Sequence, residues 1–271
     1  MNRIVLLLIL LTTSGLATYA AGVDTVEVYS KAMKKTARCV VITPEGTAPE
    51  NGWPVVYLLH GYSGNYRNWI QLVPAIVQYA SDFRLMIVCP DGDYSSWYVD
   101  SPVDSSMRYA TYIAKEVPDY IDSHYPTRRD AGGRAITGLS MGGFGGLYLG
   151  LTFRDRFGAC GSMSGGVDLN CCRTRFDVSK RIGDTLSHAA NWDQYSIHSI
   201  VATLKPEEVP AMIIDCGTSD FFYDINAALH RHLLSLEIPH DYIERPGQHN
   251  WAYWGNAVQY QLLFFANQFR R

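Results

Sequence analysis

The sequence predicts an α/β fold built on a mainly parallel sheet with helices on both faces. Several short runs of the chain are apolar at every position, which is typical of strands that are buried on both sides. Segments with a helical spacing of apolar residues alternate with these runs, as in parallel sheets whose strands are joined by helices. The chain has 271 residues, of which 47% are hydrophobic and 18% charged, so one large core can form.

The strands follow one another along the chain. β-Branched residues gather in Thr25–Tyr29 and Arg38–Thr43 around a polar turn, which indicates an antiparallel hairpin at the start. The later runs predict the strands of the parallel sheet: Val55–Leu59, Leu85–Cys89, a run that ends at Gly138, Phe157–Met163, Ala211–Cys216 and His240–Arg245.

The helices are predicted between these strands. Their expected bounds are Trp69–Ala80 with Asn68 as N-cap, Met107–His124 where Pro118 can introduce a kink, a segment that ends at Phe153, Tyr223–Leu236 and Trp251–Phe269. Residues 167–208 show no strand pattern and are more polar. We interpret them as a cap-like insertion over the active site.

One turn carries the strongest functional signal. Gly138-Leu139-Ser140-Met141-Gly142 follows a short strand and begins a helix, which is the context of a nucleophile elbow. A serine on such a turn has an unusual backbone conformation, and glycines two residues away on either side remove the steric clash. The pattern predicts Ser140 as a nucleophile and the Met141 N–H as one donor of an oxyanion hole.

The partners of a serine nucleophile in this architecture follow it along the chain, first an acid and then a histidine. Asp220 and His249 each come directly after one of the last two predicted strands. We expect His249 to take the proton of Ser140 as general base and Asp220 to orient the imidazole. The sharp turn at His60-Gly61-Tyr62 offers the Tyr62 N–H as the second oxyanion donor.

Other residues compete for these roles. Asp220 can instead cap the helix that follows it, and Asp224 is a nearby rival for the acid. Ser164 precedes two glycines but has no glycine two residues before it and no clear helix behind it. We interpret His60 as a structural side chain that holds its loop.

Charge and cysteine content exclude some classes of function. The formal net charge is −3 and no extended basic run occurs, so nucleic acid is not expected as a partner. The six cysteines show no Cys-x-x-Cys spacing, which argues against a structural zinc site. Four of them lie in strand-like runs, where buried free thiols are expected. Their pairing and the oligomeric state stay open.

The N-terminus has the pattern of a secretory signal peptide. Arg3 precedes the apolar run Ile4–Leu11, and small residues near Ala20 predict cleavage after residues 1–20. The run is far shorter than the roughly 20 residues that span a bilayer. We expect a secreted or periplasmic protein with a single catalytic domain, residues 21–271, and no stable membrane anchor after cleavage.

Five motifs in order resemble those of the putative-esterase (esterase D) branch of the α/β-hydrolases. They are Leu58-Leu59-His60-Gly61 with Asn68-Trp69, Pro90-Asp91-Gly92, the Ser140 turn, Cys216–Asp220 and Gly247–Trp251. The resemblance covers nearly the whole mature chain. It implies an α/β-hydrolase fold and a cofactor-free serine esterase with Ser140, Asp220 and His249 as triad and Tyr62 and Met141 as oxyanion donors.

The resemblance also bears on the substrate, an ester of a small molecule or a polysaccharide. The family includes S-formylglutathione hydrolases, whose substrate is cytosolic, and the signal peptide argues against that activity. Trp97, Tyr98, Trp251 and Trp254 are similar to the aromatic residues that line carbohydrate-esterase clefts and stack on a sugar or a ferulate, although they can equally pack the core.

We therefore expect an exported serine carboxylesterase that removes short acyl or hydroxycinnamoyl groups from plant-type polysaccharide or its fragments through an acyl-enzyme. Two enzymatic alternatives are a generalist short-chain esterase of tributyrin type and a thioesterase similar to S-formylglutathione hydrolase. A glycan-binding protein on an esterase scaffold is the alternative outside enzymes, because a fold alone does not fix a function.

Overall fold

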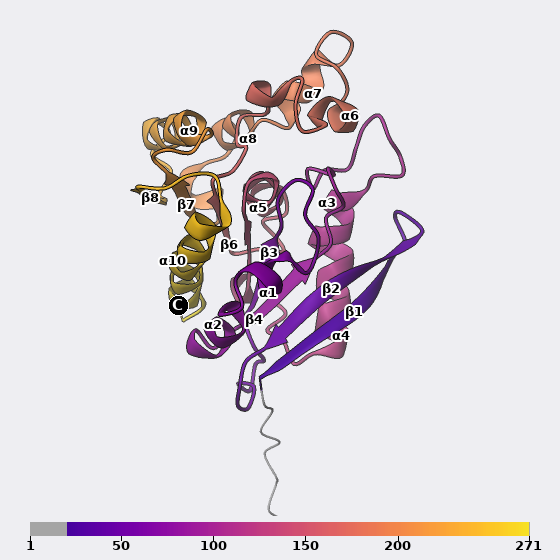
Figure 1. Ribbon diagram of the computed structural model, residues 1–271, viewed down its shortest axis with the longest axis vertical. Helices are drawn as coiled ribbons and strands as arrows, with labels where there is room; N and C mark the ends of the chain where they lie inside the picture. Colours follow the sequence, from indigo (N-terminus) through magenta and orange to yellow (C-terminus); the bar gives the residue numbers. More distant parts are fainter. Residues whose placement is uncertain (1–20, 271) are drawn as a thin grey trace, which may run out of the picture.

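The computed structural model describes residues 21–270, which form one eight-stranded sheet with helices on both faces (Figure 1). The strand order is β1-β2-β4-β3-β5-β6-β7-β8, and β3 to β8 run parallel. The hairpin of β1 and β2 joins β4 antiparallel. The predicted signal peptide, residues 1–20, lies outside the described residues. The strands are β1 (Gly22–Ser30), β2 (Lys35–Thr43), β3 (Val55–Leu59), β4 (Met86–Pro90), β5 (Arg134–Gly138), β6 (Ala159–Met163), β7 (Ala211–Gly217) and β8 (Asp241–Arg245).

The helices occupy the connections between strands. The longer ones are α4 (Val117–His124), α5 (Met141–Thr152), α9 (Tyr223–Ser235) and α10 (Trp251–Phe269), and the shorter ones are α1 (Asn68–Leu72), α2 (Ile76–Asp82), α3 (Tyr109–Thr111), α6 (Val178–Ile182), α7 (Ala189–Gln194) and α8 (Ile197–Ala202). One π-helical segment spans Tyr112–Glu116, and 3-10 turns span Ala131–Gly133, Leu169–Cys172 and Pro206–Glu208. No helix between residues 21 and 270 is long and apolar enough to span a bilayer.

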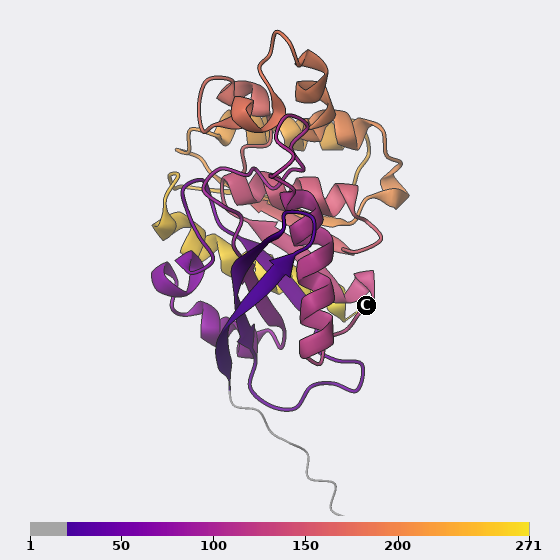
Figure 2. The same cartoon turned by 90° about the vertical axis from the view of Figure 1, so that its right-hand side faces the viewer.

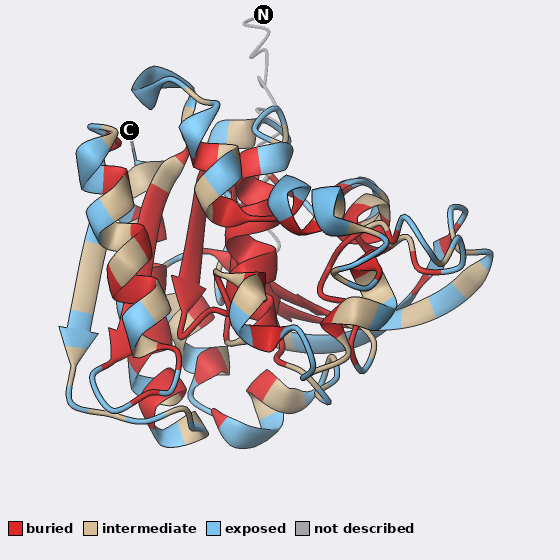
Figure 3. Ribbon diagram, turned by 90° about the horizontal axis from the view of Figure 1, so that it is seen from above, coloured by how far each residue is buried: buried red, intermediate tan, exposed pale blue. Residues whose placement is uncertain are grey.

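The sheet divides the core into two layers. Tyr57 and Leu59 of β3 face the layer that contains Phe144 of α5, whereas Val56 and Leu58 face the layer that contains Leu262 of α10. All five residues of β3 are fully buried, and Figure 3 shows the buried central strands between helices whose outer sides are exposed. This explains why the central strands have apolar residues on both faces.

The helix predicted over Trp69–Ala80 is wrong as one continuous helix. The chain forms α1 and α2 instead, and Val73, with φ −132° and ψ 67°, lies between them. Pro74 is the cause, because its ring disfavours a helical conformation at the preceding residue. Asn68 is the first residue of α1 and not its N-cap, and its side chain accepts a hydrogen bond from the Asn65 N–H at 2.8 Å.

The helical segment predicted over Met107–His124 is present but not uniform. Its middle turn is π-helical, and α4 begins immediately after it with Pro118 in its first turn. Proline has no N–H and its ring displaces the preceding carbonyl, so the wider turn before Pro118 is where the structure accommodates it. The helix is therefore irregular on the N-terminal side of Pro118, as a π-helical turn.

Residues 167–208 contain three short helices, α6, α7 and α8, and no strand. In Figures 1 and 2 these helices lie together at the end of the molecule farthest from the start of β1. Side-chain hydrogen bonds attach the segment to the loop before α3: Tyr195 donates to Asp100 O at 3.0 Å, and Ser101 donates to Arg181 O at 2.5 Å.

All six cysteines lie in the described part of the chain and are free thiols there. Cys39, Cys89, Cys160 and Cys216 are buried in or at the end of strands, as predicted. Burial raises the pKa of the Cys160 thiol to about 12, which keeps it protonated. The adjacent Cys171 and Cys172 have their Sγ atoms 3.3 Å apart.

The ion pair between Arg134 of β5 and Asp122 of α4 ties a helix to the centre of the sheet. The Arg134 side chain is only 4% exposed, and Asp122 also accepts a hydrogen bond from Thr127 at 2.7 Å. We expect Asp122→Ala to lower the free energy of unfolding by about 3–5 kcal/mol, because it leaves a buried guanidinium without its carboxylate. Urea denaturation with linear extrapolation measures the change.

The matched control for this prediction is Asp119→Ala on the same helix. Asp119 also pairs with an arginine, Arg156, but its side chain is 66% exposed. An exposed pair contributes about 0–1 kcal/mol, so the control should change stability little. Equal losses in the two variants would contradict the assignment of a stabilising role to the buried pair.

Candidate active site

The turn between β5 and α5 places Ser140 at a strained position. Ser140 has φ 56° and ψ −115°, a conformation that L-residues rarely adopt. Its N–H donates to Met163 O at 2.9 Å, and its carbonyl accepts from the N–H groups of Gly143 and Phe144. The buried strand on one side and the helix on the other, which is buried from Met141 to Leu151, therefore hold the serine in this conformation.

The glycines around Ser140 are required by close backbone approach. A Cβ on Gly142 would lie 2.5 Å from the His60 carbonyl oxygen and 2.8 Å from that of Leu59. A Cβ on Gly138 would lie 2.6 Å from Leu59 Cβ and from Leu59 O. Real Cβ atoms essentially never come this close to another atom. The end of β3 can therefore pack against the turn only because positions 138 and 142 are glycines.

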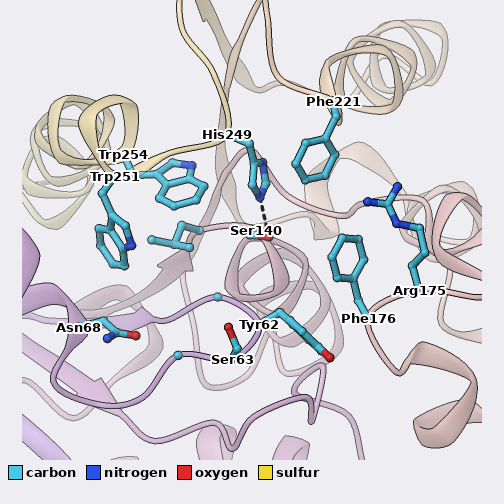
Figure 4. Close-up of a pocket in the computed structure, with 13 residues that line it drawn as sticks. Tyr62, Ser63, Asn68, Ser140, Arg175, Phe176, Phe221, His249, Trp251 and Trp254 are labelled. Carbon is cyan, nitrogen blue, oxygen red and sulfur yellow. Dashed lines mark hydrogen bonds between the residues drawn. The ribbon is translucent and has the colours of Figure 1, made fainter.

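Ser140, His249 and Asp220 form one chain of hydrogen bonds. His249 Nε2 lies 2.9 Å from Ser140 Oγ (Figure 4), and His249 Nδ1 lies 2.8 Å and 2.9 Å from the two carboxylate oxygens of Asp220. The Asp220 side chain is completely buried, and that of His249 is 14% exposed. The structure thus brings together the three residues that the sequence singled out as a triad.

Asp220 does not have the capping role that was its alternative, because the N-cap of α9 is Phe222 and no side chain caps this helix; Asp220 Oδ1 accepts the Phe222 N–H at 2.8 Å in the turn before α9. The rival acid, Asp224, is exposed in the first turn of α9. The rival nucleophile, Ser164, is fully buried and does not line the pocket described below. Neither rival forms a hydrogen bond with His249.

The loops that carry Asp220 and His249 touch because β7 and β8 are parallel neighbours. The Ser219 N–H donates to Gly247 O at 2.9 Å, linking the two loops directly. A Cβ on Gly217 would lie 2.5 Å from the same carbonyl oxygen, so this approach depends on glycine. After His249, Asn250 caps α10 by accepting the Tyr253 N–H at 3.0 Å.

The loop after β3 carries the second predicted oxyanion donor. In the part of the chain that the structure describes, neither the Tyr62 N–H nor the Met141 N–H donates a hydrogen bond. Gly61 lies against the elbow, since a Cβ there would be 3.5 Å from Ser140 Cβ. The unpaired N–H of Met141, which follows Ser140, and that of Tyr62, which follows Gly61, are therefore candidates for binding a developing oxyanion.

His60 has the structural role expected for it. The imidazole is almost completely buried, accepts the Gly92 N–H through Nε2 at 2.8 Å, and is 2.8 Å from Gly61 O through Nδ1. Burial lowers the pKa of His60, so the ring is neutral and can act as acceptor at one nitrogen and donor at the other. It thereby connects the loop after β3 to the loop after β4.

Ser140 and His249 lie on a pocket of about 500 Å³ (Figure 4). Trp251 and Trp254 from α10 lie on one side of the serine, and Phe176, Phe221 and Arg175 lie on the other. The remaining lining residues are Gly61, Tyr62, Ser63, Gly64, Asn68 and Leu139. The pocket thus combines aromatic rings on two sides of Ser140 with several polar side chains.

Two of the four aromatic residues predicted to contact substrate do not lie on this pocket. Trp97 and Tyr98 are 1% and 0% exposed and have φ angles of 52° and 57°. Their polar atoms bind the protein itself, Trp97 Nε1 donating to Phe176 O and Tyr98 OH donating to His60 O, both at 2.8 Å. The prediction that Trp97 and Tyr98 contact substrate is therefore wrong: both are buried behind the residues that line the pocket. Trp251 and Trp254 do line the pocket.

The sequence analysis missed Arg175, Phe176 and Phe221. Phe221 follows the predicted acid directly, and its ring centroid lies 4.1 Å from that of His249, so its place in the chain was a usable signal. Arg175 and Phe176 belong to the insertion, and no local pattern distinguishes them from their neighbours. Their position depends on tertiary contacts.

Within residues 21–270, no group of three or more His, Cys, Asp or Glu side chains is arranged so that it could bind a metal ion.

Comparison with known proteins identifies relatives of the whole domain. The family model described as "Putative esterase" matches residues 30–265. The acetyl esterase of Caldicellulosiruptor saccharolyticus is 26% identical over 250 residues, which cover 85% of this chain and 92% of the relative.

Solved structures show the same architecture. A ferulic acid esterase with 25% identity has a TM-score of 0.76 and is matched over 92% of this chain and 98% of its own. An S-formylglutathione hydrolase from Staphylococcus aureus, 22% identical, has a TM-score of 0.78 over 92% of this chain and 100% of its own. These similarities confirm the α/β-hydrolase fold predicted from the sequence.

The close approach at Gly142 gives a direct test of the elbow geometry. We expect Gly142→Ala to reduce turnover of p-nitrophenyl acetate by about 100-fold, the scale of a 1 Å misplacement of reacting groups. The added methyl group must displace the loop after β3, which carries the Tyr62 N–H, from the turn that carries Ser140. Steady-state kinetics on the purified variant measure the loss.

Gly255→Ala in α10 is the control for this substitution. A Cβ there would meet only the Val73 side chain, with Cγ2 at 3.4 Å and Cγ1 at 3.8 Å, and the glycine is interior to a helix. The control should keep full activity and gain about 0.5–1 kcal/mol in stability from the better helix propensity of alanine. Full activity in Gly142→Ala as well would show that the elbow tolerates a Cβ at this position.

Proposed function

This chain belongs to the Putative esterase family, and from that premise we propose that it is a serine hydrolase whose catalytic triad is Ser140, His249 and Asp220. The single observation that carries the proposal is the hydrogen-bonded chain from Ser140 Oγ through His249 to the buried Asp220. A nucleophile, a base and an orienting acid within hydrogen-bond reach are the required arrangement for acyl transfer.

In the first half of the proposed reaction, Ser140 Oγ attacks the ester carbonyl while His249 Nε2 takes the hydroxyl proton. The carbonyl oxygen becomes an oxyanion and accepts hydrogen bonds from the Tyr62 and Met141 N–H groups; losing one such donor typically costs about 3 kcal/mol of transition-state stabilisation. The tetrahedral intermediate collapses as His249 returns the proton to the departing alcohol. The acyl group is then bound to Ser140 as an ester.

In the second half, a water molecule replaces the alcohol. His249 removes a proton from the water, the hydroxide attacks the acyl carbonyl, and the same N–H groups bind the second oxyanion. Collapse releases the carboxylic acid and returns the proton to Ser140 Oγ. Asp220 keeps a hydrogen on His249 Nδ1, so Nε2 faces the serine as an acceptor, and it stabilises the imidazolium that forms.

For the substrate, we propose short acyl or hydroxycinnamoyl esters of plant-type polysaccharide or its fragments, cleaved by an exported enzyme. Trp251 and Trp254 on one side of Ser140 and Phe176 and Phe221 on the other are suited to stack on a sugar ring or a ferulate. Similarity to an acetyl esterase and to a ferulic acid esterase supports this class. The signal-like N-terminus supports export to the periplasm or the medium.

A thioesterase reaction on S-formylglutathione is the second candidate. The similarity in fold to an S-formylglutathione hydrolase favours it, and the same acyl-enzyme chemistry cleaves a thioester. The third candidate is a generalist short-chain esterase, whose aromatic pocket residues would show no preference for a sugar or a ferulate. The three differ in substrate and not in the triad.

We expect Ser140→Ala to reduce turnover of p-nitrophenyl acetate by at least about 10⁴-fold, as removal of a triad nucleophile does in other serine hydrolases. The initial rates of the wild type and Ser140→Ala should also be measured on methyl ferulate, acetylated xylan and S-formylglutathione. High Ser140-dependent rates on ferulate or acetylxylan support a carbohydrate esterase. If S-formylglutathione is the best substrate, the second candidate replaces the first.

A covalent inhibitor tests the identity of the nucleophile independently of substrate. Phenylmethylsulfonyl fluoride should label Ser140 alone, because its hydroxyl is bonded to His249 at 2.9 Å whereas the side chain of Ser164 is buried. Peptide mass mapping after inactivation locates the sulfonyl group. Labelling of Ser164, or undiminished labelling of the Ser140→Ala variant, would falsify the assignment.

A further inference from the structure

We propose that Arg175 makes this enzyme selective for esters that carry a carboxylate group. This inference rests on the proposed function, since it concerns a substrate bound beside Ser140. Arg175 lies just before α6 in the insertion and lines the same pocket as Ser140 and His249 (Figure 4). Apart from the triad histidine and the Tyr62 phenol, it is the only lining side chain that can ionise.

The guanidinium is positioned by aromatic rings. Its central carbon lies 4.8 Å from the ring centroid of Phe176 and 6.0 Å from that of Phe221, both of which line the pocket. Such stacking occupies the face of the guanidinium and leaves its N–H donors at the edge free. Two parallel N–H groups match the two oxygens of a carboxylate.

The charge of Arg175 is not neutralised within the described residues. Arg175 belongs to none of the ion pairs found between residues 21 and 270, and no Asp or Glu lines the pocket. The nearest acid in the chain, Asp177, is bound by Lys180 Nζ at 2.9 Å and by the Tyr62 hydroxyl at 3.2 Å. Lys180 is the main cause of the lowered pKa of Asp177, so that carboxylate is ionised and already paired.

The segment that carries Arg175 is held in place on both sides. Phe176 and Asp177 have φ angles of 57° and 56°, unusual values for residues other than glycine. The Phe176 carbonyl accepts the indole N–H of the buried Trp97 at 2.8 Å, and Asp177 is bound to Tyr62 as described above. These contacts present Arg175 at a defined place on the wall, which reduces the entropy lost when it binds a ligand.

The charge of Arg175 matters because of the other charges near Ser140. With a neutral His249, the buried carboxylate of Asp220 gives the triad a net charge of −1, which disfavours an anionic substrate. Arg175 supplies the opposite charge at the exposed edge of the pocket, beside Phe176 and Phe221, where dissolved salt can screen it. An ester with a carboxylate that reaches this wall gains a charge-assisted hydrogen bond that a neutral ester lacks.

The carboxylate can belong to either part of the ester. On the alcohol side it would be that of a uronic acid, and on the acyl side that of a dicarboxylic acid monoester. Two pairs of substrates separate these sources. Acetylated 4-hydroxybenzoate and acetylated 4-hydroxybenzamide differ in the charge of the alcohol part, and monomethyl terephthalate and methyl 4-carbamoylbenzoate differ in the charge of the acyl part.

The experiment measures kcat/KM for both members of each pair with the wild type, Arg175→Gln, Arg175→Lys and Arg173→Gln. We expect the wild type to prefer the carboxylate member of one pair, and Arg175→Gln to reduce the ratio of carboxylate to amide by about 2- to 5-fold, the scale of an exposed charge pair. Arg175→Lys should keep part of the ratio because it keeps the charge, and added salt should lower it in the wild type. Arg173 is exposed, binds Asn170 and does not line the pocket, so Arg173→Gln is the matched control.

The ratio is independent of any general loss of activity, because a misfolded fraction affects both members equally. Equal turnover of carboxylate and amide by the wild type in both pairs, or an unchanged ratio in Arg175→Gln, overturns the inference. If the wild type cleaves neither pair, inhibition of p-nitrophenyl acetate turnover by terephthalate and by terephthalamide gives the same ratio. Failure of the proposed function would appear separately, as turnover of a neutral ester that does not depend on Ser140.

Discussion

The site depends on one backbone constraint, the conformation of Ser140 at φ 56° and ψ −115°. That conformation points the side chain out of a turn between two fully buried elements, while the carbonyl of the same residue begins the hydrogen bonding of α5. It exists only because the end of β3 can approach the turn to within contact of Gly138 and Gly142. The packing of the two central strands and the exposure of the nucleophile are therefore one structural feature.

The same approach of β3 positions the loop that carries one of the two proposed oxyanion donors. Leu59 and His60 lie against the elbow, and the Tyr62 N–H follows them in the chain; like the Met141 N–H, it donates no hydrogen bond within residues 21–270. Hydrogen bonds from Gly92 to His60, from Tyr98 to the His60 carbonyl, and from Trp69 to the Leu59 carbonyl fix this loop from three directions. A site that must bind developing charge needs donors that do not reorganise, and this network supplies that rigidity.

The sequence predicted the sheet, and the proximity of Ser140, Asp220 and His249, because both have local signals. Strands buried on both faces are apolar throughout, so β3 was located to the residue, and strand ends in a parallel sheet meet at one edge, which placed Asp220 and His249 near Ser140. The break at Val73 was missed because the apolar spacing continues through Pro74. Trp97 and Tyr98 were misassigned because their left-handed backbone conformations turn them inward, and no spacing rule reports that.

The insertion side of the pocket and the Ser140 turn are held in place by different kinds of interaction. Substitutions are therefore expected to affect them differently. The elbow and the donor loops are fixed by backbone packing, where a single methyl group has no room. Phe176 and Arg175 are fixed by side-chain contacts that the insertion makes with Trp97, Tyr62 and Phe221. Because these contacts lie outside the turn that carries Ser140, substitutions in residues 167–208 can alter which ester is bound while the machinery that cleaves it stays in place. Phe221, Trp251 and Trp254 line the same pocket, but Phe221 directly follows Asp220 and the two tryptophans lie in the helix after His249, so substitutions there are expected to disturb the triad geometry as well.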